Sequence, residues 1–109
     1  MTENITVEIG GKTLELKPTL RAARVANTVR GGFTAALRGI QDGDMNTIVM
    51  VISAGIGKTK PDEINDMEET LFNEGIDKFI GPSVQFIVRL MNGGRDPAAE
   101  ADKEPPKGK

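Results

Sequence analysis

The segment that most resembles a ligand-binding motif is Gly-Lys-Thr at 57–59, which follows an apolar run from Ile48 to Ile52. In phosphate-binding loops, backbone N–H groups and a lysine hold phosphates, and a threonine hydroxyl holds magnesium. That motif also needs a glycine five residues before Gly57, where this chain has Ile52. Pro61 falls where the next helix would begin, and no apolar strand ending in Asp follows. We therefore predict a helix end and a linker without a cofactor, and a small nucleotide-binding regulator is a remote alternative.

A second candidate, for calcium, begins at Asp42. Asp42, Asp44 and Asn46 match the first three ligand positions of a calcium-binding loop. Thr47, however, stands at the position that requires glycine, and Ser53 stands at that of the bidentate glutamate. The segment is therefore predicted to be a turn followed by a helix cap.

The residue types missing from the chain exclude several kinds of chemistry. The sequence has no Cys and no His, which removes the thiol nucleophile, the zinc-thiolate site and the commonest general base. Paired carboxylates such as Glu68 and Glu69 would need a cleft, and consecutive helical positions point in different directions. We predict no catalytic residue, no metal site and a protein that is not an enzyme.

Basic and acidic residues are segregated along the chain. The stretch from Lys17 to Gln41 holds five bases and no acid, whereas Asp42 to Asp77 holds nine acids and two bases. Two solvated faces explain this pattern, and the alternative is head-to-tail self-association through opposite patches. A net charge of −2 and the scarcity of aromatic residues disfavour nucleic-acid binding. The arginines that a protein partner could contact are Arg21, Arg24, Arg30 and Arg38.

Four phenylalanines make up the aromatic content. Burial in the core is their default interpretation, because phenylalanine is usually buried. The alternative is an exposed apolar face for a partner. On that alternative, Phe33, Phe72 and Phe86 join the four arginines as candidate partner contacts.

The elements that would position these residues begin with a hairpin over 4–17. Apolar and polar residues alternate on both sides of Gly10-Gly11, so Ile5, Val7 and Ile9 share a face with Leu14 and Leu16. Two glycines suit a primed two-residue turn, which needs positive φ. Because a lone hairpin is marginal in water, helices must cover it.

Five helices are predicted after the hairpin, at approximately 19–30, 33–41, 44–56, 60–74 and 77–92. Their predicted caps are Thr19, Asp44, Thr59 and Asp77. The inward face of the first helix is predicted at Leu20, Ala23, Ala26 and Val29, and that of the fourth at Ile64, Met67, Leu71 and Phe72. Pro82 predicts a kink in the last helix. The β-branched run at 48–52 keeps a buried strand open as an alternative.

These patterns predict one mainly α (α+β) domain over residues 1–94, with a small bundle of four to five helices. Residues 95–109 are rich in Pro, Ala and charged residues and lack apolar periodicity, which predicts a disordered tail. The longest apolar run is far shorter than the roughly 20 residues that span a bilayer. We therefore expect a soluble intracellular protein without a membrane partner.

From about Ile5 to Gly94 the chain resembles the tail assembly chaperones of long-tailed bacteriophages, in the branch shared with gene transfer agents. The matching segments are the hairpin Gly11 to Leu20, the helix rich in small residues after it, the segment Gly43 to Gly55, and the ending Val84-Gln-Phe-Ile-Val-Arg-Leu-Met-Asn-Gly93. In the helix after the proline the family typically has an acidic residue, where this chain has Arg24 and Asn27.

The resemblance implies a non-enzymatic protein of the bacterial host cytoplasm that binds the tape measure protein and keeps it soluble. Tail tube subunits would then polymerise around that client and displace the chaperone, which is not expected in the mature virion. Family members often have a longer form made by ribosomal frameshifting, and the polar end at 103–109 suits such a junction. The alternative is a structural tail component, a tube or completion protein, that stays in the virion.

Overall fold

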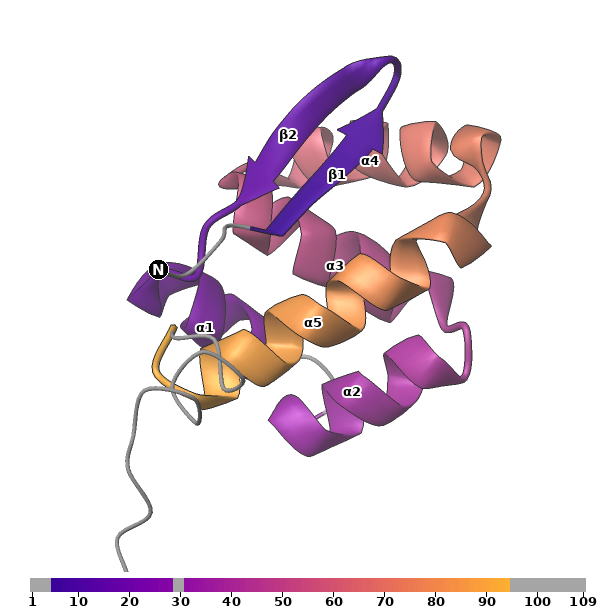
Figure 1. Ribbon diagram of the computed structural model, residues 1–109. Coiled ribbons are helices and arrows are strands. Elements are labelled where there is room, and N and C mark those ends of the chain that lie inside the picture. Colours follow the sequence, from indigo (N-terminus) through magenta and orange to yellow (C-terminus); the bar gives the residue numbers. More distant parts are fainter. Residues whose placement is uncertain (1–4, 29–30, 95–109) are drawn as a thin grey trace, which may run out of the picture.

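The N-terminal hairpin has the register that its alternating sequence predicts. In the computed structural model, which describes residues 5–28 and 31–94, β1 (Ile5–Ile9) pairs antiparallel with β2 (Lys12–Leu16), and Val7 lies opposite Leu14 (Figure 1). Gly10 and Gly11 both have positive φ, as a primed turn requires. The apolar side of β1 is buried and its polar side is exposed, so the hairpin lays one face on the helices.

Helices joined by short turns follow the hairpin, and their order matches the predicted one. They are α1 (Leu20–Thr28), α2 (Phe33–Gln41), α3 (Met45–Ile56), α4 (Pro61–Glu74), the 3₁₀ helix η2 (Ile76–Phe79) and α5 (Ile80–Met91). The mainly α fold with an N-terminal hairpin is therefore confirmed. Arg30 and the predicted tail at 95–109 lie outside the described residues.

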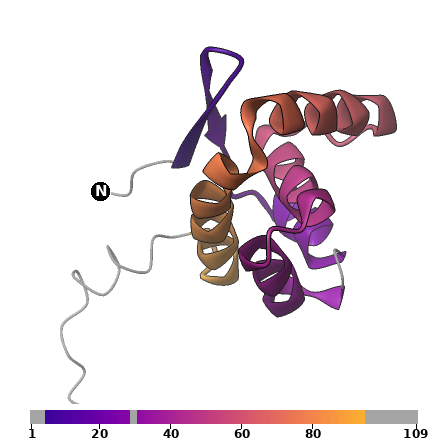
Figure 2. The same ribbon diagram turned by 90° about the vertical axis from the view of Figure 1, so that its right-hand side faces the viewer.

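Helix α3 lies at the centre of the molecule. It contacts the other four α-helices and β2, and the other elements surround it in two perpendicular views (Figures 1 and 2). Eight of its residues are buried, from Thr47 to Gly55 with Met50 left out. A helix buried on most sides needs apolar residues all round, which explains the continuous apolar run at 48–52. The strand alternative for that run is wrong.

A glycine inside α3 lets its neighbours approach closely. A Cβ atom at Gly55 would lie 2.9 Å from Leu16 Cδ2 and 3.1 Å from Phe86 Cε2. The Gly55 carbonyl also accepts a hydrogen bond of 2.9 Å from the Lys17 N–H, just after β2. Gly55 is therefore the position at which both the hairpin and α5 pack closely against α3.

Two helix starts differ from the prediction. The N-cap of α4 is Lys60 and not Thr59, and the Lys60 N–H donates to Glu63 Oε1 over 3.2 Å. The segment at 77–92 is not one helix, because η2 precedes α5 and Phe79 is the N-cap of α5. Asp77 lies inside η2, whose N-cap is Gly75, so the prediction that Asp77 caps the last helix is wrong. Pro82 lies in the first turn of α5, where a backbone N–H has no helical partner, so it requires no kink.

Two predicted inward residues face outward. Leu20 is 68% exposed, and the buried residues of α1 are Ala22 and Ala26. Phe72 is 66% exposed, whereas Met67 and Leu71 form the buried side of α4. Among the described residues, no helix is both long enough and apolar enough to cross a membrane.

Candidate partner-binding surface

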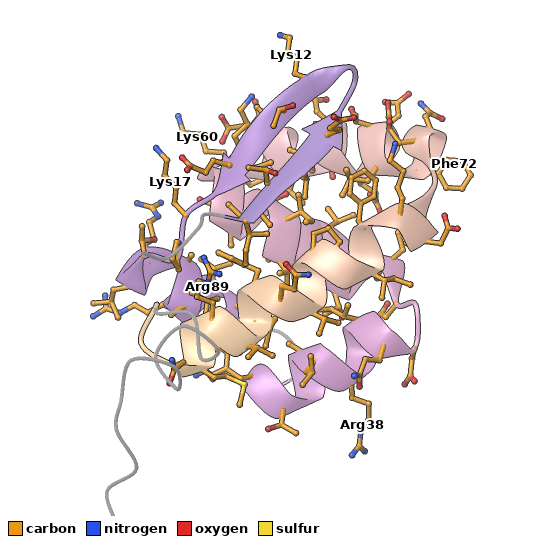
Figure 3. All side chains as sticks on the ribbon, in the orientation of Figure 1. Lys12, Lys17, Arg38, Lys60, Phe72 and Arg89 are labelled. Atoms are coloured by element: carbon orange, nitrogen blue, oxygen red, sulfur yellow. The ribbon has the colours of Figure 1, made fainter. Side chains whose placement is uncertain are left out.

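The phenylalanines divide into core and surface residues. Phe86 is completely buried, so the prediction that it contacts a partner is wrong, and Phe79 lies in the core as well. Phe33 is half-buried at the first position of α2. Phe72 projects from the end of α4 at the edge of the molecule (Figure 3).

The described candidate arginines are all exposed, but they lie on two different helices. Arg21 and Arg24 are on α1, and the Arg21 Nη2 donates to Thr59 Oγ1 over 3.4 Å. Arg38 is on α2 and points away from the body of the protein (Figure 3). The structure therefore separates the basic stretch of the sequence into two surfaces.

The outer side of α5 is an apolar surface that the sequence analysis did not single out. Val88 is 36% exposed and Met91 51% exposed, and Val84 is half-buried one turn before Val88. The one charged residue of α5, Arg89, is buried. The sequence feature that could have revealed this surface is a second apolar stripe, with Val84, Val88 and Met91 at i, i+4 and i+7. It lies beside the stripe that packs into the core, which consists of Ser83, Phe86, Ile87 and Leu90.

Helix α2 packs beside α5 and carries two further apolar residues that stay partly accessible to solvent. The two helices are in contact and lie side by side in both views (Figures 1 and 2). On α2, Phe33 and Leu37 pack against the core and keep part of their surface in solvent, while Arg38 is fully at the outside. We call Phe33, Leu37, Val84, Val88 and Met91 the α2–α5 surface. Apolar side chains that stay accessible to solvent on adjacent helices are typical of a protein-binding site.

The two candidate ligand sites are helix ends. Residues 48–56 belong to α3, and Gly57 ends that helix with φ of 93°, so the strand and loop of a phosphate site are not formed. Asp44 is the N-cap residue of α3 and accepts a hydrogen bond of 2.7 Å from the Thr47 hydroxyl. In the described part of the chain, no group of three or more acidic side chains could hold a metal ion.

One carboxylate ties the hairpin turn to α4. Glu74 Oε2 accepts a hydrogen bond of 3.1 Å from the Gly10 N–H, and Glu74 Oε1 lies 2.8 Å from Lys78 Nζ. The hydrogen bond from Lys78, that from Gly10 and the charge of Lys78 lower the pKa of Glu74. This contact holds the tip of the hairpin and is part of the fold rather than of a reactive site.

Comparison of the chain with protein-family models, with curated proteins and with solved structures finds no match.

Proposed function

We propose that this protein is a tail assembly chaperone that binds a tape measure protein through the α2–α5 surface. The observation that carries the proposal is the outer side of α5, where Val84, Val88 and Met91 are at least partly exposed and no charge interrupts them. A long helical client offers apolar side chains at i, i+3 and i+4, which pack against such a helical surface. The resemblance of the sequence to this family supports the same assignment.

Reversible binding follows from the size of this surface. A few partly exposed apolar side chains bury little area, so each copy binds weakly, and several copies on one client gain from multivalency. Tail tube subunits that bind the client more tightly would then displace the copies one by one. The chaperone acts in the cytoplasm of the bacterial host and leaves before the particle is complete.

Co-expression with the tape measure candidate of the same genome tests the proposal. We expect a soluble complex with several copies of this protein per client, measured by pull-down and by light scattering with refractive-index detection. The latter is needed because a chain without Trp or Tyr absorbs little at the usual wavelength. An insoluble client that does not co-purify contradicts the proposal, and presence of the protein in finished particles favours a structural tail component.

Two variants link the binding to the α2–α5 surface. Val88→Glu and Met91→Glu place a charge on exposed positions, and each is expected to lower client recovery at least tenfold, because a charge must be desolvated against apolar surface. Asn27→Glu is the matched control, since Asn27 is also exposed but lies on α1 and not on α2 or α5. Equal client recovery with all three variants would remove the α2–α5 surface from the proposal.

A further inference from the structure

Helices α1 and α4 present opposite charges to solvent. Helix α1 carries Arg21 and Arg24 and no acid, and both arginines are exposed. Helix α4 carries six acids and no base, and its exposed acids are Asp62, Asp66 and Glu69. Neither Arg24 nor Glu69 forms an ion pair with another described residue. Both charges are therefore available to a partner of opposite sign.

Each of these charges has an exposed apolar neighbour one helical turn away. Leu20 precedes Arg24 by four residues, and Glu69 precedes Phe72 by three, so the members of each pair lie on the same side of their helix. Leu20 is 68% exposed and Phe72 is 66% exposed, the two largest values among the large apolar residues that stay at the surface. The two helices thus present matching pairs of one large apolar and one charged side chain.

A hollow lies beside Leu20, between the start of α1 and the end of α5. Its volume is about 220 Å³, and its walls include Pro18, Leu20, Ala23 and Leu90. Gly94 approaches Pro18 so closely that a Cβ atom there would lie 3.2 Å from the Pro18 carbonyl oxygen. Because an apolar cavity of about 150 Å³ can bind benzene, this hollow is large enough for a phenyl ring.

The ring and the hollow lie on opposite sides of the molecule. Helix α1 is at the left of Figure 1, and Phe72 is at the right edge of Figure 3, which has the same orientation. Phe72 therefore cannot enter the hollow of its own chain. We propose that Phe72 of one copy inserts between α1 and α5 of a second copy, where Glu69 faces Arg24. This contact uses two different surfaces, so each added copy leaves one of each kind free for the next.

Light scattering and sedimentation over a concentration series test this contact on the protein alone. We expect the average mass to rise with concentration and to fall when salt is added, because the charge pair is exposed. Phe72→Ser and Arg24→Glu are each expected to keep the protein monomeric at concentrations where the original chain associates. Arg38→Glu is the matched control, an exposed arginine on α2 whose change is expected to leave association unaltered.

Mixing the two disabled variants distinguishes a head-to-tail contact from a symmetric one. Phe72→Ser keeps an intact hollow and Arg24→Glu keeps an intact phenyl ring, so the mixture is expected to form dimers and nothing larger. Circular dichroism checks that both variants fold. A chain that stays monomeric at every concentration overturns the proposal, as does association that neither variant reduces. The client surface is on other residues, so this result is independent of the proposed chaperone function.

Discussion

Gly55 is the residue where the core leaves the least room. A Cβ atom there would lie 2.9 to 3.1 Å from Leu16 and Phe86, and both neighbours are completely buried. We expect Gly55→Ala to destabilise the protein by up to about 2 kcal/mol, because an overpacking cost of about 1–3 kcal/mol opposes a gain of about 1 kcal/mol in helix propensity. Urea unfolding measures the change. Gly81→Ala in α5 is the control, since nothing lies within 4 Å of its Cβ position and no loss is expected there.

The contact between Glu74 and the hairpin turn contributes to stability in a pH-dependent way. The Lys78 and Gly10 hydrogen bonds lower the pKa of Glu74 in the folded chain below that in the unfolded chain. Its contribution to stability is therefore complete above the unfolded-state pKa and is lost as the pH falls through the folded-state pKa. We expect the Gly10 amide shift in NMR to titrate with a midpoint below 4.5, and Glu74→Gln to abolish that titration. A midpoint at or above 4.5 would contradict the role assigned to the two donors.

The candidate site depends on single residues whose exposure the sequence could not give. Phe72 and Phe86 both fall on apolar positions of predicted helices, yet one is 66% exposed and the other is completely buried. Helical periodicity locates an apolar stripe, but the neighbours that cover the stripe come from distant parts of the chain. The prediction that Leu20 faces inward is wrong for the same reason, because the buried side of α1 is formed by Ala22 and Ala26.

At the scale of elements, local sequence was a reliable guide wherever a strong local interaction fixes the backbone. The register of β1 with β2 follows from period-two alternation and from two glycines, and Gly57 and Gly75 end α3 and α4. The start of α5 was not predicted, because η2 and α5 are continuous in apolar pattern and only the backbone hydrogen bonds separate them. Helix type at such a junction depends on tertiary packing more than on propensity.

The start of α1 offers a direct test of a local signal. Thr19 Oγ1 accepts a hydrogen bond of 3.0 Å from the Ala22 N–H, as the predicted cap requires. Thr19→Ala removes that acceptor and is expected to lower the free energy of unfolding by about 1 kcal/mol. Thr19→Ser retains the acceptor and should lose at most a few tenths of a kcal/mol. If both variants have the stability of the original chain in urea unfolding, the cap does not stabilise α1.

At the scale of the whole molecule, the hairpin and helices share one core, because α3 contacts β2 and every other α-helix. Phe86 lies in this core, so Phe86→Ala is expected to cost about 3–5 kcal/mol. That is a large part of the roughly 5–15 kcal/mol that stabilises a small domain, whereas Phe72→Ala should change stability by less than about 0.5 kcal/mol. Unfolding in urea, followed by circular dichroism and by NMR signals of the hairpin, measures both variants. Because one core joins the elements, the two signals should share one midpoint in each variant, and a hairpin that melts before the helices would show that the core is divided.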